Sequence, residues 1–213
     1  MPGTVITIAQ QKGGAGKTTL AIHLALAWAA SGHRVSLVDI DPQASLSSWF
    51  QLRHQRLAAG ATLIDVAAVS GWRVAGEVER QAREHDIVLI DSPPHAETEA
   101  RIAVRAGQLV LVPVQPSPID LWATKPILDL ARAEKTPALL VLNRVPARAN
   151  LTGILHDAFV ALDVPLAKTQ IGNRVALAAA INEGQGILEY EPSSAAAREI
   201  KALADEVLRR CAG

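Results

Sequence analysis

The sequence predicts an α/β fold built on a twisted, mostly parallel sheet with helices on both faces. Two observations lead to this prediction. Short apolar runs alternate with longer helix-like segments along the chain, which is the pattern of strand–helix–strand units. The apolar runs also show little alternation of polar and apolar residues, as expected for strands that helices cover on both sides.

The N-terminal half begins with a strand and a buried helix. Thr4–Ala9 is rich in β-branched residues and predicts a strand, and Lys17–Ala30 is apolar on nearly every side, which predicts a helix packed between the sheet and other helices. Gly32 ends that helix, and Ser45 can cap the next one. The other segments are strands at Arg34–Ile40, Thr62–Val66 and Asp86–Asp91, and helices at Ser45–Ala58, Val74–Glu84 and Glu97–Ala106.

The C-terminal half continues the alternation. The expected strands are Gln108–Val114, Ala138–Asn143 and the short Pro165–Gln170, and the expected helices are Ile119–Ala133, Leu151–Leu162, Arg174–Asn182 and about Ser193 to Arg210. Apolar residues of the last helix recur at the spacing of one helical face, which predicts that it packs on the core. No repeat or linker divides the chain, so we expect one domain over residues 1–213.

Composition and charge exclude several classes of protein. Of the 213 residues, 49% are hydrophobic and 20% are charged, which is typical of a folded globular chain. The 21 basic residues balance the 21 acidic ones, so any nucleic-acid or membrane contact needs a local patch or an oligomer. The single Cys211 excludes a disulfide framework or a multi-cysteine metal site within one chain. No secretory signal or apolar run of about 18 residues occurs, so we expect a cytoplasmic protein.

The segment Gln11–Thr19, with the sequence QKGGAGKTT, is the most informative motif. It lies between a predicted strand and a predicted helix, which is the context that a phosphate-binding loop needs. Its glycines let the backbone N–H groups point inward, and the helix N-terminus adds partial positive charge. Lys17 supplies a full charge for the β- and γ-phosphates, and Thr18 supplies a hydroxyl for Mg²⁺. The expected nucleotide-binding residues are Gly13, Gly14, Ala15, Gly16, Lys17, Thr18 and Thr19, in a P-loop NTPase domain that uses ATP and Mg²⁺.

Carboxylates end two of the other predicted strands. Asp91 closes the run DIVLID, and Asp39 and Asp41 end the second strand in VDIDPQ. The carboxyl ends of parallel strands lie at one edge of a sheet, so these side chains should converge on the phosphate-binding loop. A magnesium nucleotide site uses such a carboxylate to orient the water shell of the metal.

These motifs resemble those of the ParA/MinD family of ATPases. KGGAGKTT, with Lys12 ahead of the glycine pair, is similar to the deviant Walker A motif of that family. VDIDPQAS is similar to its Walker A′ segment and VLIDSPP to its Walker B segment. The likeness covers essentially the whole chain and is strongest to the small ParA-type (ParF-like) partition proteins, whose C-terminal end resembles GILEYEPSSAAAREIKALADEVLRR here.

The resemblance implies an ATPase with a slow basal rate that forms a sandwich dimer when it binds ATP. Lys12 would be the signature lysine that reaches phosphate on the partner's nucleotide, but the residues alone leave open a plain surface charge. Asp41 would position the attacking water. The expected catalytic residues are therefore Lys12, Lys17 and Asp41, the expected metal-side residues are Thr18, Asp39 and Asp91, and the expected adenine-side residues are Pro116, Asn143 and Arg144.

Members of the family differ in the surface on which they act. ParA-type members bind non-specific DNA, and the expected contacts here are Arg174, Lys168, Arg198 and Lys201. A solvated face balanced by Glu199, Asp205 and Glu206 is an equally good interpretation of each basic residue taken singly. A membrane-cycling ATPase of MinD type is the alternative, disfavoured because only Cys-Ala-Gly follows Arg210.

The expected partners follow from the same resemblance. They are a second copy of the chain in an ATP-dependent homodimer, non-specific DNA, and a ParB-like or ParG-like protein that stimulates hydrolysis. A membrane partner is not expected, and the location implied is the cytoplasm in association with the nucleoid. The sequence leaves open whether the cargo is a plasmid, a chromosome or a protein cluster.

Overall fold

A six-stranded parallel sheet forms the centre of the computed structural model, which describes residues 2–57, 64–94, 97–147, 159 and 162–212. The strand order is β3-β2-β4-β1-β5-β6, and every neighbouring pair is parallel. The strands are β1 (Thr4–Ile8), β2 (Val35–Asp39), β3 (Ile64–Ala68), β4 (Ile87–Asp91), β5 (Leu109–Val114) and β6 (Ala138–Leu142). The predicted α/β fold is confirmed.

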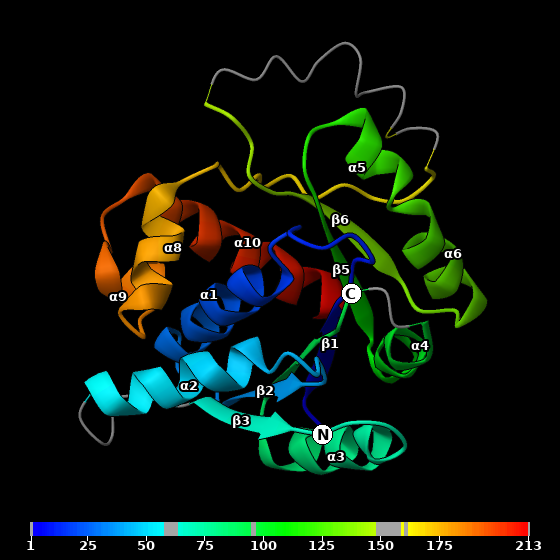
Figure 1. Ribbon diagram of the computed structural model, residues 1–213, viewed down its shortest axis with the longest axis horizontal. Coiled ribbons are helices and arrows are strands. Elements are labelled where there is room, and N and C mark those ends of the chain that lie inside the picture. The colour runs from blue at the N-terminus through cyan, green and yellow to red at the C-terminus, as the bar shows by residue number, and fades with distance from the viewer. Residues whose placement is uncertain (1, 58–63, 95–96, 148–158, 160–161, 213) are drawn as a thin grey trace.

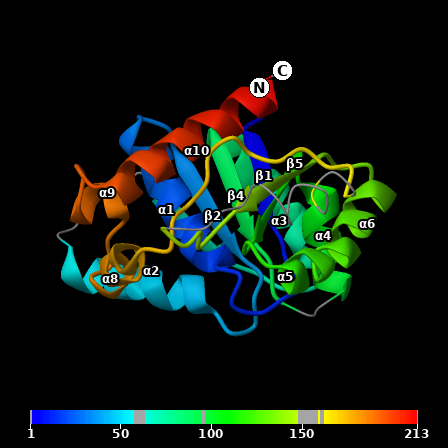
Figure 2. The ribbon, with the colours of Figure 1, turned by 90° about the horizontal axis from the view of Figure 1, so that it is seen from above.

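Helices cover both faces of this sheet (Figures 1 and 2). On one face lie α1 (Lys17–Ala30), α2 (Ser45–Arg56), α8 (Val175–Asn182), α9 (Ile187–Tyr190) and α10 (Ala195–Ala212). On the other lie α3 (Arg73–Glu84), α4 (Glu97–Ala106) and α6 (Lys125–Ala133). The short α5 (Pro118–Trp122) packs through Leu121 against the carboxyl ends of β5 and β6.

Helix α1 is buried on nearly all sides, as its sequence predicts. It lies between the sheet and α10, and Trp28 near its end is only 1% exposed. The Trp28 indole donates a hydrogen bond to the carbonyl oxygen of Ala204 in α10 (3.1 Å), so the polar atom of this side chain is satisfied in the core. Because α1 begins directly after the glycine-rich loop, this packing fixes the direction in which that loop faces.

The strand register brings the functional carboxylates together. β4 lies between β1 and β2, and Asp91 at its end pairs in register with Ile8 on one side and Asp39 on the other. All three strands end at the same edge of the sheet. This edge is where the glycine-rich loop leaves β1.

The outer edge of β6 is covered by the chain itself. The amide of Leu140 donates to the carbonyl of Pro165, and the amides of Ala167 and Ile171 donate to the carbonyls of Leu140 and Leu142. Leu140 and Leu166 form a single parallel bridge, so the predicted strand at Pro165–Gln170 follows β6 without forming a regular strand of its own.

Other predicted elements also differ from the structure. The single helix expected over Ile119–Ala133 is divided into α5 and α6, because Pro126 has no amide hydrogen for the helical bond to the carbonyl of residue 122. Ser45 is the first residue of α2 and makes no side-chain cap. Helix α9 was not expected, and the helix expected at Leu151–Leu162 falls almost entirely outside the described residues.

Candidate nucleotide site

The glycine-rich loop between β1 and α1 has the backbone conformation that its glycines predict. Gly14 and Gly16 have φ values of 76° and 86°, in the left-handed region that other residues adopt at a cost. A Cβ at Gly16 would lie 2.7 Å from Nδ2 of Asn143, so glycine is also required for space. No side chain caps the first turn of α1 and no acidic residue lies in it, so its N–H groups face the loop unneutralised.

Lys17 lies where the loop meets the helix and is only 7% exposed. Its Nζ donates to the carbonyl oxygen of Gln10 (3.0 Å). Burial lowers the pKa of Lys17, while the charges of Asp91 and Asp41 oppose that shift. The ammonium lines a cavity of about 240 Å³ together with Gly13, Gly14, Gly16, Thr18, Thr19, Asp41, Pro94 and Arg144. The structure thus brings these predicted loop residues and Asp41 to one cavity.

The Asp91 carboxylate lies next to the Thr18 hydroxyl, as expected for the metal side of the site. Oγ1 of Thr18 donates to Oδ2 of Asp91 (2.6 Å), and Asp91 is 1% exposed. Burial raises the pKa of Asp91 to about 7, although the Thr18 hydrogen bond and the Lys17 charge oppose it. Its other oxygen, Oδ1, has no hydrogen-bond partner among the described residues. A buried carboxylate oxygen without a partner, beside a hydroxyl, fits a magnesium ion or one of its waters.

The Asp39 carboxylate, also expected on the metal side, makes hydrogen bonds within the loop that follows β2 and at the start of α2. Its Oδ1 accepts from the amide of Asp41 (3.2 Å), and its Oδ2 accepts from the amide (2.9 Å) and hydroxyl (2.7 Å) of Ser47. Asp39 therefore caps the first turn of α2, the function that Ser45 was expected to serve. Both of its oxygens are engaged in shaping the Walker A′ loop.

Lys12 does not line the phosphate cavity of its own chain. Its Nζ forms an ion pair with Oδ1 of Asp120 in α5 (2.8 Å), and its side chain is 37% exposed. Asp120 is held in turn by Ser117, whose hydroxyl donates to Oδ2 of Asp120 and accepts from the Asp120 amide. The two lysines of the loop therefore face different surroundings: Lys17 faces the cavity and Lys12 faces α5.

The comparison with protein families agrees with this geometry. A family model described as "CobQ/CobB/MinD/ParA nucleotide binding domain" matches residues 6–187. The chain belongs to this family. It is a nucleotide-binding domain and a ParA/MinD family ATPase.

Curated relatives and solved structures show how far the similarity extends. The chain is 28% identical to maintenance of carboxysome distribution protein A of Halothiobacillus neapolitanus, over 95% of each chain. It is 32% identical to the chromosome-partitioning ATPase Soj of Thermus thermophilus, over 96% of this chain and 95% of that protein. The MinD cell division ATPase of Pyrococcus furiosus has the same fold, with a TM-score of 0.81, 23% identity and coverage of 98% and 99%. The pNOB8 ParA bound to nonspecific DNA gives a TM-score of 0.68 at 20% identity and 98% coverage of both chains.

The predicted adenine-side residues of this ParA/MinD family member lie at the end of β6 and in the loop after β5. Nδ2 of Asn143 donates to the carbonyl oxygen of Ala15 (2.8 Å), so Asn143 supports the phosphate-binding loop directly. Arg144, with a φ of 55°, lines the phosphate cavity. Pro116 does not line that cavity, but its neighbour Gln115 donates to the carbonyl oxygen of Gly14 (3.4 Å).

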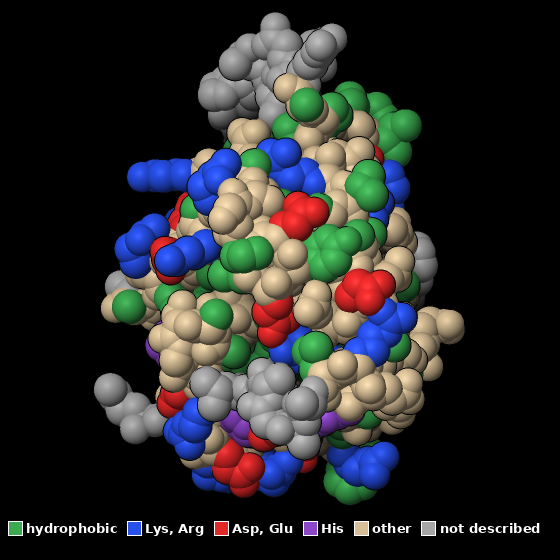
Figure 3. All heavy atoms as spheres, turned by 90° about the vertical axis from the view of Figure 1, so that its left-hand side faces the viewer, with side chains coloured by type: hydrophobic (Ala, Val, Ile, Leu, Met, Phe, Trp, Pro, Cys, Tyr) green, Lys and Arg blue, Asp and Glu red, His purple; other side chains and the backbone are tan. Residues whose placement is uncertain are grey.

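The basic residues expected to contact DNA lie around α8 and α10. Arg174 is the N-cap of α8, and its guanidinium forms an ion pair with Glu199 of α10. Lys168 is exposed, with its backbone amide bonded to the carboxylate of Glu206. Arg198 and Lys201 are exposed on α10. Acidic and basic side chains are interspersed over the face that α8, α9 and α2 present in Figure 3, so no basic patch of one sign covers that view.

Two residues hold the lysines of the loop through contacts that were not predicted, although Asp120 ends the loop Gln115–Asp120 that the family resemblance assigns to the adenine side. Gln10 is 2% exposed and supplies the carbonyl that holds Lys17, and Asp120 holds Lys12. The spacing Ser117-x-x-Asp120 at a helix start is a capping pattern, and it was a signal that could have identified Asp120. Gln10, the last residue before the expected loop, carries no such signal. Among the described helices, none is both long and apolar enough to cross a bilayer.

Proposed function

We propose that this protein is a partition or positioning ATPase whose ATP-bound sandwich dimer binds non-specific DNA. A ParB-like or ParG-like partner would stimulate hydrolysis and release the dimer from DNA. The cycle would segregate or distribute a cargo. The names of the two curated relatives refer to carboxysome distribution and to chromosome partitioning. We therefore propose the class of activity and leave the cargo open.

The residues around the cavity support the hydrolytic half of the proposal. Lys17 and the free N–H groups of α1 provide positive charge for the β- and γ-phosphates of ATP. Asp41 lines the same cavity and would hold the attacking water. Thr18 and Asp91 would hold Mg²⁺, which when bound neutralises phosphate charge. None of these residues is placed as a strong general base at the cavity, which favours a slow basal rate.

The position of Lys12 is the observation that carries the dimer proposal. Its ammonium pairs with Asp120 of α5 and does not line the cavity of its own chain, which favours a role toward a nucleotide held by another copy. Exchange of the Asp120 carboxylate for a partner's phosphate would link ATP binding to dimer formation. Ile119 and Trp122 flank Asp120 on α5 and are 66% and 72% exposed, so this edge offers apolar surface for the closed dimer to cover.

Light scattering during size-exclusion chromatography tests the switch. With ATP and Mg²⁺ we expect the wild-type mass to double relative to the ADP state. Lys12→Ala and Lys17→Ala should remain monomers, whereas Asp41→Ala should dimerise but release no phosphate. Lys125→Ala is the matched control for loss of an ion-paired lysine, because Lys125 pairs with Asp129 on the surface of α6.

Three outcomes would contradict the proposal. They are a wild-type protein that stays monomeric with ATP, a Lys12→Ala variant that dimerises like the wild type, and a dimer that binds anionic vesicles but not duplex DNA. The last result would support the membrane-cycling alternative.

A further inference from the structure

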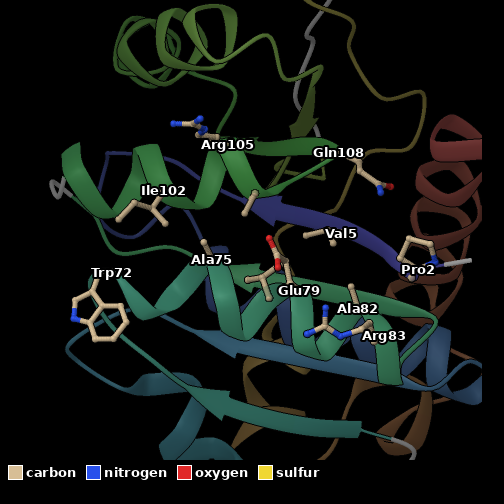
Figure 4. A pocket seen from close by; sticks show the side chains of 13 residues that line it. Pro2, Val5, Trp72, Ala75, Glu79, Ala82, Arg83, Ile102, Arg105 and Gln108 are labelled. Carbon is tan, nitrogen blue, oxygen red and sulfur yellow. The ribbon is translucent and has the colours of Figure 1, made fainter.

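An open groove lies between α3 and α4, on the face of the sheet opposite α1 and α10. Its volume is about 720 Å³. Figure 4 shows the side chains that line it. The floor is apolar and comes from three elements: Val5 of β1, Val78 and Ala82 of α3, and Ile102 and Ala106 of α4. Trp72 stands at one end of the groove and Pro2 at the other.

The rim of the groove carries the residue types that dominate protein interfaces. Trp72 is 88% exposed, which is unusual for the largest apolar side chain. Arg83 and Arg105 stand on the α3 and α4 walls, and neither makes an ion pair within the part of the chain that the structure describes. Tryptophan and arginine are the side chains most enriched among residues whose loss weakens an interface. Glu79 is the single acidic residue of the lining.

We propose that this groove binds an amphipathic helix of a partner protein, with apolar side chains on the floor and acidic side chains beside Arg83 and Arg105. The two walls are parallel helices of 12 and 10 residues, which at 1.5 Å per residue are about 18 and 15 Å long. A partner helix of about three turns matches that length and packs between two helices as a third ridge.

Charge favours this occupant over the other candidates. Two arginines against one glutamate attract an acidic segment and repel a basic one. A symmetric contact between two copies would bring two groove linings of the same net positive charge together across the two-fold axis. The apolar floor and Glu79 are poor contacts for a phosphate backbone.

The groove is separate from the ATPase site. None of its lining residues lines the phosphate cavity. The inference therefore stands or falls independently of the proposed function, and variants in the groove should keep the basal ATPase rate of the wild type.

Calorimetry with a designed probe tests the proposal on the full chain. The probe is a 14-residue lactam-bridged helical peptide with leucines on one face and glutamates along both borders, and the matched peptide has lysine in place of each glutamate. We expect saturable binding of the acidic peptide and at least tenfold weaker binding of the lysine peptide. Trp72→Ala should weaken the acidic peptide about tenfold or more, consistent with loss of an interface anchor.

The chain supplies two controls for this experiment. Trp122→Ala removes another highly exposed tryptophan outside the groove and should leave binding unchanged. The double substitution Arg83→Glu and Arg105→Glu should reverse the preference, so that the lysine peptide binds more tightly than the acidic one. Thermal melts of all variants should match the wild type, and so should the basal ATPase rates of the groove variants Trp72→Ala and Arg83→Glu/Arg105→Glu.

Several results would overturn the proposal. They are no saturable binding of the acidic peptide at millimolar concentration, equal effects of Trp72→Ala and Trp122→Ala, and no reversal in the double variant. Sedimentation equilibrium without nucleotide provides a further test, since self-association lost in Trp72→Ala would assign the groove to a second copy.

Discussion

The phosphate-binding edge of the sheet and the basic end formed by α8 and α10 both carry charged residues, but they differ in what those residues already contact. At the phosphate edge, Oδ1 of Asp91 has no partner among the described residues and Lys17 rests on a backbone carbonyl. At the α8–α10 end, Arg174 is already paired with Glu199, which also accepts from the amide of Gly172. The first region is arranged to receive a charged ligand, whereas the second needs a competing ligand to displace an internal partner.

Two buried side chains connect the regions. His23 of α1 accepts at Nδ1 from the amide of Ile187 in α9 (3.1 Å), and its Nε2 lies 3.1 Å from the carbonyl oxygen of Leu177 in α8. Arg53 of α2 donates to the carbonyl oxygen of Gly184 (2.7 Å) and forms an ion pair with Glu189. Helices α1 and α2, which begin at the nucleotide edge, are thus hydrogen-bonded to the segment before α10. Substitutions in either region, or at His23 and Arg53, therefore test how the two regions differ.

The largest expected effect is at the phosphate edge. Lys17→Ala removes the buried charge that faces the cavity, so we expect nucleotide affinity and turnover to fall at least about 100-fold, the loss of two or more tenfold steps in binding free energy. Titration of a fluorescent ATP analogue and phosphate release measure both. Lys168→Ala at the other end should change neither, and retention of binding by Lys17→Ala would break the distinction between the regions.

Arg53 tests the link from α2. Arg53→Ala leaves the Gly184 carbonyl without its arginine donor and the Glu189 carboxylate without its charge partner, although the Gly186 amide still donates to Glu189, and we expect the free energy of unfolding to fall by about 2–3 kcal/mol. Denaturant titration measures it. Arg56→Ala, one turn away, removes an exposed pair with Glu183 and should cost less than about 0.5 kcal/mol. Equal losses would show that the buried link contributes no more than a surface pair.

His23 tests the link from α1 through pH. Burial lowers its pKa from 6.5 to about 4, despite opposing contributions from the Leu177 carbonyl and the Glu189 charge. His23 of the unfolded chain is therefore protonated near pH 6.5, whereas His23 of the folded chain is protonated only near pH 4. The contribution of neutral His23 to the free energy of unfolding is complete above pH 6.5. It should decrease by up to about 3 kcal/mol as the pH falls from 6.5 to about 4.

His23→Gln removes that titration, so its loss of stability between pH 7 and pH 4.5 should be smaller than that of the wild type. Denaturant titrations at both pH values measure the difference. His54→Gln, which changes an exposed histidine on α2, serves as the control. An unchanged pH dependence in His23→Gln would contradict the assignment.

The smallest expected effect is at the α8–α10 end. Glu199→Gln frees Arg174 from its internal partner, so we expect the affinity of the ATP-bound protein for duplex DNA to rise a few-fold. The slope of log K against log salt should steepen by at most about 0.9, the value of one phosphate contact. Fluorescence anisotropy at several salt concentrations measures both. The control is Asp205→Asn, which removes an exposed negative charge of α10 without freeing an arginine. If Asp205→Asn raised the DNA affinity as much as Glu199→Gln, the change in net charge alone would explain the increase.

The same contrast explains which features the sequence predicted. The glycine-rich loop, Asp91 and Asp41 could be predicted to lie at one edge of the sheet, because the loop depends on neighbours in the chain and the carboxylates follow parallel strands that end together. The bounds of α1 and α4 were predicted to the residue, because each follows a clear loop signal and continues without interruption. Local information was sufficient for these features.

Features that depend on distant partners were missed. The carboxylate that caps α2 comes from Asp39 of the preceding strand, not from Ser45 at the start of the helix. Balance of the basic residues by Glu199 was one of two interpretations left open, but the specific ion pair between Arg174 and Glu199, 25 positions apart, was not predicted. The division between α5 and α6 could have been predicted from Pro126. Proline has no amide hydrogen and interrupts a helix even where the apolar residues continue at helical spacing.

The two borders of the sheet have one more consequence. Both β3 and β6 are edge strands, but the segment that begins at Pro165 bonds to backbone groups of Leu140 and Leu142 on the outer side of β6, whereas no described segment pairs with the outer side of β3. Among the described residues, β3 is therefore the one uncovered strand edge of each copy, and main-chain pairing through a single edge joins two molecules without extending further. Any filament of this ATPase has to grow through its helices and side chains, and agents that block amyloid-like stacking should leave such a polymer intact.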